Sequence, residues 1–310
     1  MSEQPNTGSR RPSYKTDLSD AQWELLRKLI PPAVAKSGRP PTDLREILNT
    51  LLYQNHTGCQ WDMLPHDLAA KSTAFDYYKA WQKDGTWQLI LDRLRGQLRV
   101  ATPRVEPKGK ETANNGEDQP EEPPCAADNQ QQQPAAVEVS PRQETPSFVI
   151  MDSQSVKTTE VGGEQRGYDG GKKVKGRKRH IAVDTLGLLC AVVVTAANVS
   201  DGRGACHLLD HMSPTKFPRL QGVCGDGRYN DKKLIAKLQR RKLELEVKTR
   251  PPSAKGFVLL KKRWIVERTF AWLGFNRRLS KDYERHVWSS ETRVRLAAIT
   301  TMLRRLTKLA

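Results

Sequence analysis

The sequence has no run of about 18 apolar residues, the length that a helix needs to span a bilayer. Its first residues, Met1 to Arg11, are polar and lack the apolar core of a secretory signal. The five cysteines are odd in number and contain no CxxC pair, which argues against a disulfide framework and against a zinc site. Acidic residues are scarce, because 35 Asp and Glu stand against 52 Lys and Arg. The missing apolar run and signal predict a soluble, cytoplasmic protein, and the net charge of +17 predicts a polyanionic partner.

The 310 residues are enough for two domains of ordinary size, and composition indicates the boundary between them. Residues 101–146 are rich in Pro and Gln, almost free of aromatics, and hold nine acidic against four basic residues. Such a segment cannot bury enough apolar surface to offset the entropy of ordering. We predict a disordered linker over 101–146, a disordered N-terminus over 1–14, and folded domains over 15–100 and 147–310.

The first folded part is typical of short helices separated by tight turns. Ser19 and Gln22 have the spacing of a capping box, after which Leu and Trp residues recur at helical spacing. This pattern fits a helix-turn-helix module whose DNA-recognition helix contains Tyr77, Tyr78 and Lys79. A helical bundle whose aromatic side chains form the core fits it equally well.

After residue 147 the hydrophobic pattern changes from helical to strand-like. Strands are predicted at Phe148 to Val156, Arg179 to Asp184, Leu188 to Ala196, Leu220 to Gly225 and Leu245 to Thr249. A tight turn at Thr185-Leu186-Gly187 joins the second and third strands as an antiparallel hairpin. Helical segments follow the third, fourth and fifth strands. The order predicts an α/β domain with a mixed sheet and flanking helices.

Asp152 is the most informative single residue, because it is a carboxylate within the apolar run that begins at Phe148. Burying an ionised side chain is unfavourable unless a partner compensates, and a divalent metal is the strongest such partner. In a strongly basic protein, a carboxylate that holds a metal favours phosphodiester chemistry. A strand-edge position in which backbone donors satisfy Asp152 is the alternative.

Two further carboxylates complete the oxygen ligands that two-metal phosphodiester transfer requires. Asp226 follows the fourth predicted strand, at the end where open α/β sheets build their sites, although Asp-Gly is also a common turn. Glu267 shares a helical face with Trp264 and other large apolar residues, where a solvated glutamate is unexpected. An ion pair with Arg263 or Arg268 would explain Glu267 equally well.

Three other aspartates are weaker candidates for the metal site. Asp184 precedes a turn and Asp201 lies at a helix start, so turn and cap roles explain both. Asp169 lies in a glycine-rich stretch. None of them replaces the chosen three.

A basic loop follows the first predicted strand. Residues 172–179 hold six Lys or Arg in eight positions, and glycines flank them. Because this loop leaves the strand that carries Asp152, we expect it to clamp DNA beside the site. The predicted contacts are Lys172, Lys173, Lys175, Arg177 and Lys178. A solvated run of charge is the alternative.

Several motifs resemble those of bacterial insertion-sequence transposases of the DDE class, in the branch named after insertion sequence five. The motifs are Asp152-Ser153-Gln154-Ser155-Val156-Lys157, Gly167-Tyr168-Asp169-Gly170-Gly171-Lys172-Lys173, Arg177-Lys178-Arg179-His180, Val183-Asp184-Thr185-Leu186-Gly187 and Ala196-Ala197-Asn198-Val199-Ser200-Asp201. The stretch from Arg263 to Leu273 is similar to the glutamate helix of that family. Leu18 to Trp23 and Gly58 to Trp61 resemble its small helical domain, so the resemblance covers residues 15–100 and 147–288.

The resemblance implies a ribonuclease-H-like catalytic fold in which Asp152, Asp226 and Glu267 bind the metal and carry the catalysis. It implies Mg²⁺ as cofactor, with Mn²⁺ as a substitute, and Tyr229 fits the family's aromatic near the second aspartate. The implied partner is double-stranded DNA on the bacterial nucleoid, cleaved at terminal inverted repeats and joined through its 3′ hydroxyl to target DNA. Pairing of two DNA ends is compatible with a homodimer. A DNA-binding regulator without catalysis and a nuclease of the same fold remain the alternatives.

The sequence departs from the family's signature at two positions. Where the family has a tyrosine before the arginine and a basic residue after the glutamate, this chain has Leu260 and Gly274. The arginine itself, Arg263, is present. We expect Arg277 and Arg278 to supply the missing positive charge, and Arg263 to contact DNA with them.

Overall fold

The computed structural model describes residues 11–33, 41–107, 137–248 and 261–309. The α-helices are α1 (Asp20–Arg27), α2 (Leu44–Thr57), α3 (Lys71–Lys83), α4 (Thr86–Val100), α5 (Asp201–His211), α6 (Lys232–Arg240), α7 (Lys261–Gly274) and α8 (Val287–Leu309). The strands are β1 (Arg104–Pro107), β2 (Val137–Ser140), β3 (Phe148–Lys157), β4 (Gly167–Asp169), β5 (Val174–Val183), β6 (Leu189–Ala196), β7 (Gly222–Gly225) and β8 (Glu244–Val247). Short 3₁₀ turns are η1 (Trp61–Met63), η2 (Gly227–Tyr229) and η3 (Arg277–Leu279). Within these described ranges no helix is long and apolar enough to cross a membrane.

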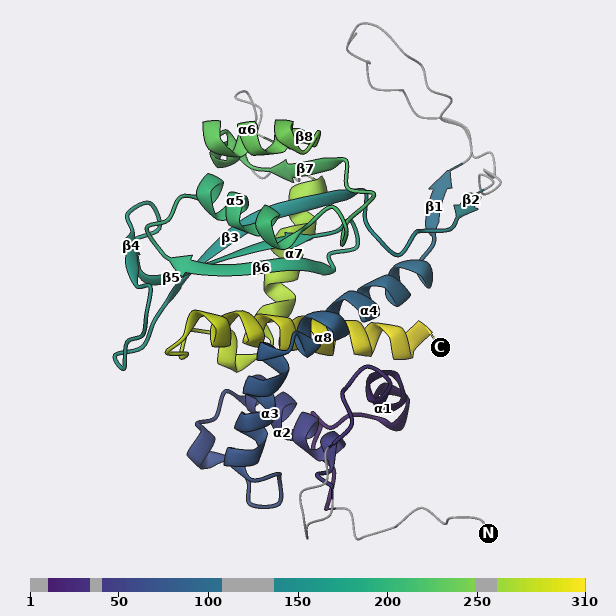
Figure 1. Cartoon of the computed structure of the whole chain (residues 1–310), viewed down its shortest axis with the longest axis vertical. Helices are drawn as coiled ribbons and strands as arrows, with labels where there is room; N and C mark the ends of the chain where they lie inside the picture. Colours follow the sequence, from purple (N-terminus) through teal and green to yellow (C-terminus); the bar gives the residue numbers. More distant parts are fainter. Residues whose placement is uncertain (1–10, 34–40, 108–136, 249–260, 310) are drawn as a thin grey trace, which may run out of the picture.

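The central sheet is mixed, with β3 at its middle (Figure 1). β3 pairs antiparallel with β5 and parallel with β7, and β8 extends the parallel side. β5 pairs on its other edge with β6 and with the short β4. This arrangement confirms the predicted α/β fold with a mixed sheet and flanking helices, and it includes the predicted hairpin between β5 and β6. The short β4 was not predicted.

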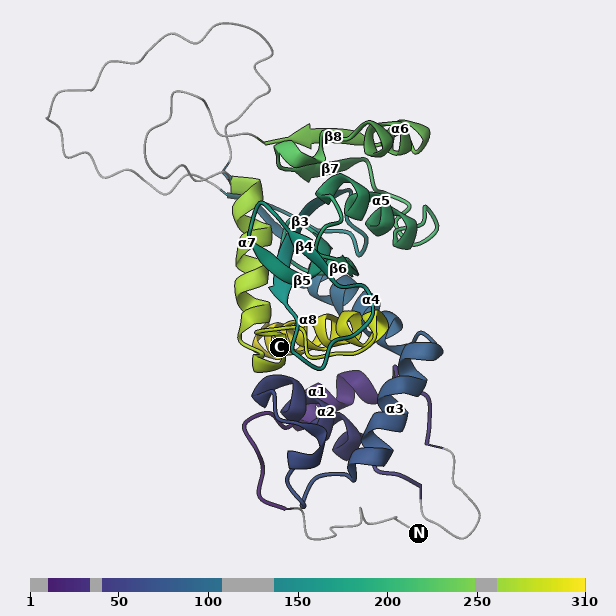
Figure 2. The ribbon, with the colours of Figure 1, turned by 90° about the vertical axis from the view of Figure 1, so that its left-hand side faces the viewer.

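Helices cover both faces of the sheet, so the two faces of β3 belong to different hydrophobic clusters. Val149 packs in a cluster with Leu208 of α5 and Leu234 of α6. Ile150 packs in the other cluster, with Val266 of α7. Because side chains alternate along a strand, Asp152 shares the face of Ile150 and is directed toward α7. Figure 2 shows α7 running along one side of the sheet toward α8.

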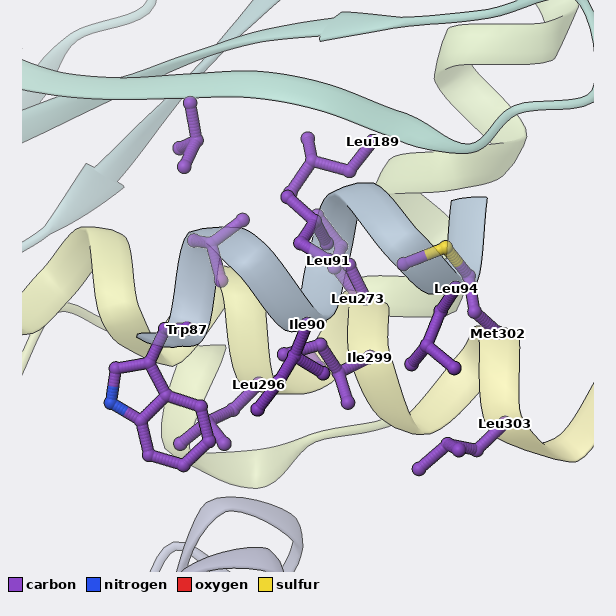
Figure 3. Close-up of a cluster of buried hydrophobic side chains, with 14 of the residues drawn as sticks. Trp87, Ile90, Leu91, Leu94, Leu189, Leu273, Leu296, Ile299, Met302 and Leu303 are labelled. Carbon is purple, nitrogen blue, oxygen red and sulfur yellow. The ribbon is translucent and has the colours of Figure 1, made fainter. Parts of the chain in front are cut away.

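The N-terminal helices share their core with the α/β part of the chain. Figure 3 shows Trp87 and Leu91 of α4 beside Leu296 and Ile299 of α8, with Leu189 of β6 above them. The predicted capping box of α1 is confirmed, because the Ser19 hydroxyl accepts a hydrogen bond from the backbone amide of Gln22. The described residues between 15 and 100 are therefore mainly helical as predicted, and their helices share a core with the part that follows the predicted linker.

The ends of the predicted linker and of the predicted N-terminal tail carry ordered structure. β1 and β2 pair antiparallel, with Arg104 opposite Ser140. Arg11 forms ion pairs of 2.8 Å with Asp17 and with Glu46. The remaining parts of both predictions, residues 1–10 and 108–136, lie outside the described residues.

Candidate active site

Asp152 lies half-buried on β3, on the face that α7 covers. Its carboxylate accepts a hydrogen bond of 2.7 Å from the backbone amide of Ser153. Burial is the largest influence and raises the pKa of Asp152 to about 6, and the negative charge of Asp226 adds to this rise. The amide of Ser153 and the positive charges of Arg263 and Lys172 act in the opposite direction. Asp152 is thus a carboxylate whose charge the site disfavours.

Asp226 lies beside Asp152 because the strands that carry them are parallel neighbours. In the pairing of β3 with β7, Ile150 is opposite Cys224, and each aspartate follows two residues later. Asp226 therefore follows the end of β7 directly, and it lies beside Asp152 in the middle of β3, just past the point where the two strands stop pairing. Asp226 also begins η2 by accepting a hydrogen bond of 2.9 Å from the amide of Arg228. Together with Arg263 of α7, the two aspartates line one small pocket.

Glu267 lies one helical turn after Arg263 on α7 and is half exposed. Its Oε1 atom is 3.3 Å from Nε of Arg263, the arginine that lines the pocket of the two aspartates. Among the residues that the structure describes, no group of three or more His, Cys, Asp or Glu side chains lies together in a way that could hold a metal ion. The structure therefore brings Asp152 and Asp226 together, whereas Glu267 is linked to their pocket through its ion pair with Arg263 and does not line it.

The two aspartates fit a divalent cation by their chemistry. Carboxylate oxygens are the ligands that Mg²⁺ and Mn²⁺ prefer. The charge of Asp226 raises the pKa of Asp152, and a cation between the two would relieve this repulsion. Glu267 fits less directly, because its carboxylate faces Arg263.

The basic loop between β4 and β5 extends to the site. Lys172, Lys173 and Lys175 are exposed. The Nζ atom of Lys172 donates a hydrogen bond of 3.2 Å to the carbonyl of Ser153, which places this ammonium group next to Asp152. These three lysines remain available to a phosphate chain that approaches the carboxylates.

Arg177 and Lys178 of the same basic run are buried within β5. Arg177 has no exposed surface and forms an ion pair of 3.1 Å with Asp282. Nζ of Lys178 lies 3.3 Å from carboxylate oxygens of both Asp169 and Asp201. In this conformation the two side chains form ion pairs that link β5 to neighbouring segments of the fold, and they are not accessible to DNA.

In α3, the residues of the predicted recognition helix divide in the same way. Tyr78 is fully buried, and its hydroxyl donates a hydrogen bond of 2.7 Å to the carbonyl of Ser289 in α8. Burial raises the pKa of Tyr78 to about 12. Lys79 is exposed and Tyr77 is partly exposed. Of the three predicted contact residues, Tyr77 and Lys79 therefore have side-chain atoms that a partner could reach, whereas Tyr78 does not.

The two arginines expected to replace the missing basic residue also differ. Arg278 is buried and donates a hydrogen bond of 2.8 Å to Glu284. Arg277 is exposed. Of the two positions at which the sequence departs from the signature, Gly274 is exposed at the end of α7, whereas Leu260 lies outside the described residues.

Tyr229 and Asp201 belong to the surroundings of the site more closely than their sequence positions indicate. The buried Tyr229 hydroxyl has no hydrogen-bond partner among the described residues. Burial is the largest cause that raises its pKa, followed by the charges of Asp152, Asp201 and Asp226. Asp201 accepts a hydrogen bond of 2.6 Å from the hydroxyl of Ser153, the neighbour of Asp152. The resemblance alone pointed to Tyr229, while the cap position of Asp201 concealed its contact with β3.

Two protein families and one curated relative match this chain. A family described as "Transposase DDE domain" matches residues 143–303, and a family described as "Putative transposase of IS4/5 family" matches residues 18–91. A protein of Burkholderia cepacia described as "Putative transposase for insertion sequence element IS402" is 34% identical over 116 residues. That alignment covers 36% of this chain and 54% of the Burkholderia protein, so it spans about half the length of this relative.

Proposed function

The chain belongs to the family of DDE transposases, and from this premise we propose that it cuts DNA at the ends of an insertion sequence and joins the freed 3′ hydroxyl to target DNA. The observation that supports this proposal best is the meeting of Asp152, from the middle of β3, and Asp226, just after β7, in one pocket beside the helix that carries Glu267. The family implies a ribonuclease-H-like fold, with which the mixed sheet and its flanking helices agree. The proposed partner of the protein is DNA, and this agrees with the net charge of +17.

Asp152, Asp226 and Glu267 are the proposed metal ligands. Bound divalent ions would activate the attacking oxygen and stabilise the leaving oxygen during phosphodiester transfer. Glu267 would join the aspartates by turning away from Arg263, which is a change of side-chain rotamer on the solvent side of α7. Arg263, released from Glu267, would then be free to contact a DNA phosphate in the same pocket.

The proposed DNA contacts near the site are the exposed cations of the basic loop. Lys172 and Lys173 lie on the turn that precedes β5, Lys175 lies at the start of β5, and Lys172 reaches the backbone next to Asp152. We propose that the helical part of the chain binds the terminal repeat of the insertion sequence through Tyr77 and Lys79. Arg277 completes the proposed set.

The test is a cleavage assay on DNA that flanks the chain's own reading frame, with Mg²⁺. Asp152→Asn, Asp226→Asn and Glu267→Gln are each expected to reduce cleavage at least about a hundredfold, because each removes a ligand whose metal stabilises the transition state by several kcal/mol. Asp210→Asn is the matched control, since Asp210 is 60% exposed on α5 and pairs with Lys237, and it should cleave as the wild type does.

The products of the same assay distinguish the proposal from its alternatives. Wild-type protein that cuts the ends without joining them to a target would identify a nuclease of the same fold. Protein that binds the ends without cutting them would identify a regulator. Full cleavage by any of the three variants would remove that residue from the site.

A further inference from the structure

A cationic groove lies where α2, α7 and α8 meet, at the far end of α7 from Arg263. Its volume is about 350 Å³. The lining side chains include His56, Trp272, Phe275, Arg304, Arg305 and Lys308, and none of the lining residues is acidic. Arg304 and Lys308 are exposed, and Phe275 keeps 70% of its surface accessible. The groove therefore presents positive charge together with an open aromatic face.

The positive field of this groove acts on His56 at the end of α2. Burial is the largest cause that lowers the pKa of His56, and the charges of Arg304 and Arg277 lower it further. Arg277 approaches because Gly58 ends α2 in the left-handed conformation (φ 74°), and a Cβ atom at Gly58 would lie 3.1 Å from the backbone of Arg277. In the described part of the chain, no ion pair neutralises Arg277, Arg304 or Lys308.

A row of alternating aromatic rings and guanidinium groups runs along α7 from the groove to Trp264, the residue that follows Arg263. The guanidinium of Arg268 lies 4.6 Å from the ring centroids of both Trp264 and Trp272. The guanidinium of Arg305, in the groove, lies 5.6 Å from the ring of Trp272. From Glu267 to the end of α7 the helix rises by about 10 Å, which is roughly the length of three stacked nucleotides.

We propose that this groove binds an unpaired stretch of the DNA strand next to the cleaved bond, with phosphates on Arg304 and Lys308 and a base stacked on Phe275. The inference rests on the proposed function, which supplies the cleaved strand. A duplex hides the faces of its bases, whereas an unpaired base offers its face to an exposed ring. The cations that line the groove together with Phe275 are the complement of the phosphates that flank such a base.

The test measures binding of a fluorescently labelled oligothymidine to the full chain by anisotropy, in EDTA. Phe275→Ala is expected to weaken binding at least about fivefold, and Phe275→Trp to retain it, because a ring remains for stacking. The double variant Arg304→Ala and Lys308→Ala should flatten the slope of log affinity against log salt by about 1.4.

Matched controls come from exposed residues elsewhere. Val161→Ala removes an apolar side chain that is 70% exposed, and Lys216→Ala removes an exposed cation. Lys216 lines a different pocket with Glu291 near the start of α8, about 20 Å along this helix from Arg304. Both controls should bind as the wild type does, and thermal unfolding checks that every variant is folded.

Two results would overturn the inference. One is equal oligothymidine binding by the wild type and a folded Phe275→Ala. The other is an equal loss of affinity for a duplex of the same length, because the groove would then not select unpaired DNA. End cleavage by the wild type is assayed in parallel. If the wild type cleaves and Phe275→Ala binds oligothymidine as the wild type does, the groove proposal is wrong and the proposed function stands. Lost binding without any wild-type cleavage supports the groove and counts against the proposed function.

Discussion

Asp152 lies where the folded chain disfavours its charge. Burial, and then Asp226, raises the pKa of Asp152 from 3.8 to about 6. A carboxyl group with a raised folded pKa stabilises the fold while it is protonated, so this contribution is present below about pH 4 and is lost as the pH rises through 6. At pH 7 the ionised group lowers the free energy of unfolding by about 3 kcal/mol. A cost of this size is typical of a residue retained for function.

Replacing Asp152 should therefore stabilise the protein in the absence of divalent ions. Asp152→Asn is expected to raise the free energy of unfolding at pH 7 by about 1 to 3 kcal/mol, and the gain should disappear near pH 4. Urea denaturation in EDTA at several pH values measures this difference. Asp210→Asn, at an exposed position, should change stability by less than about 0.5 kcal/mol at either pH. A less stable Asp152→Asn at pH 7 would contradict the assignment of a disfavoured charge.

The sequence is informative where a single residue breaks a pattern. Asp152 interrupts an apolar strand and Asp226 follows one directly, so these two aspartates could be singled out, while their role as metal ligands stays a prediction. The sequence could not show that Lys173 is exposed while Arg177 is buried, although both belong to the same basic run. The carboxylate that pairs with Arg177 belongs to Asp282, more than a hundred residues away. Burial and distant partners decide such roles, and one sequence does not display them.

At the scale of the element, α3 has some side chains that pack in the core and others that are exposed to solvent. Tyr78 lies among aromatic rings and under α8, whereas Lys79 extends into solvent. The two interpretations of the sequence, recognition helix and aromatic core, are thus compatible, because neighbouring residues of one helix face different surroundings. Helical spacing alone could not assign Tyr78 to the core, since its partner Ser289 is remote in sequence.

Substitutions on the two faces of α3 should have separable effects. Lys79→Ala is expected to weaken binding to end DNA and to reduce the slope of log affinity against log salt by about 0.9, the value for one phosphate contact. Tyr78→Phe should leave DNA affinity unchanged while lowering the free energy of unfolding by about 1 kcal/mol, because it removes the hydrogen bond to Ser289. Anisotropy and urea denaturation measure the two quantities. Unchanged affinity and slope for Lys79→Ala would exclude this lysine from the DNA contact.

At the scale of the whole molecule, the helical part and the α/β part are joined by a buried ion pair as well as by their common core. Nη1 of Arg99 in α4 lies 2.5 Å from the carboxylate of Asp184, which has no exposed surface. Asp184 also accepts hydrogen bonds from the amides of Leu186 and Leu188 in the turn between β5 and β6. The sequence predicted two domains on a linker because the composition of 101–146 interrupts the chain. The sequence could not reveal that α8, near the end of the chain, packs against the N-terminal helices.

Removing Arg99 should destabilise both parts together. Arg99→Ala leaves a buried aspartate unpaired and is expected to lower the free energy of unfolding by about 3 to 5 kcal/mol. Because the core is shared, calorimetry should record one transition that moves as a unit. Arg93→Ala, at an exposed position of the same helix, is the control and should change stability by less than about 0.5 kcal/mol. Two separate transitions, with only one of them shifted, would show that the parts unfold independently.

The central claim is that Asp152, Asp226 and Glu267 hold divalent ions jointly. The most direct measurement is the binding of Mn²⁺ to the full chain in complex with end DNA, followed by electron paramagnetic resonance. The wild type and Asp210→Asn should bind the ion alike. Asp152→Asn, Asp226→Asn and Glu267→Gln should each lose at least about tenfold in affinity. Wild-type affinity in Glu267→Gln would leave the two aspartates as the whole site and contradict the three-carboxylate account.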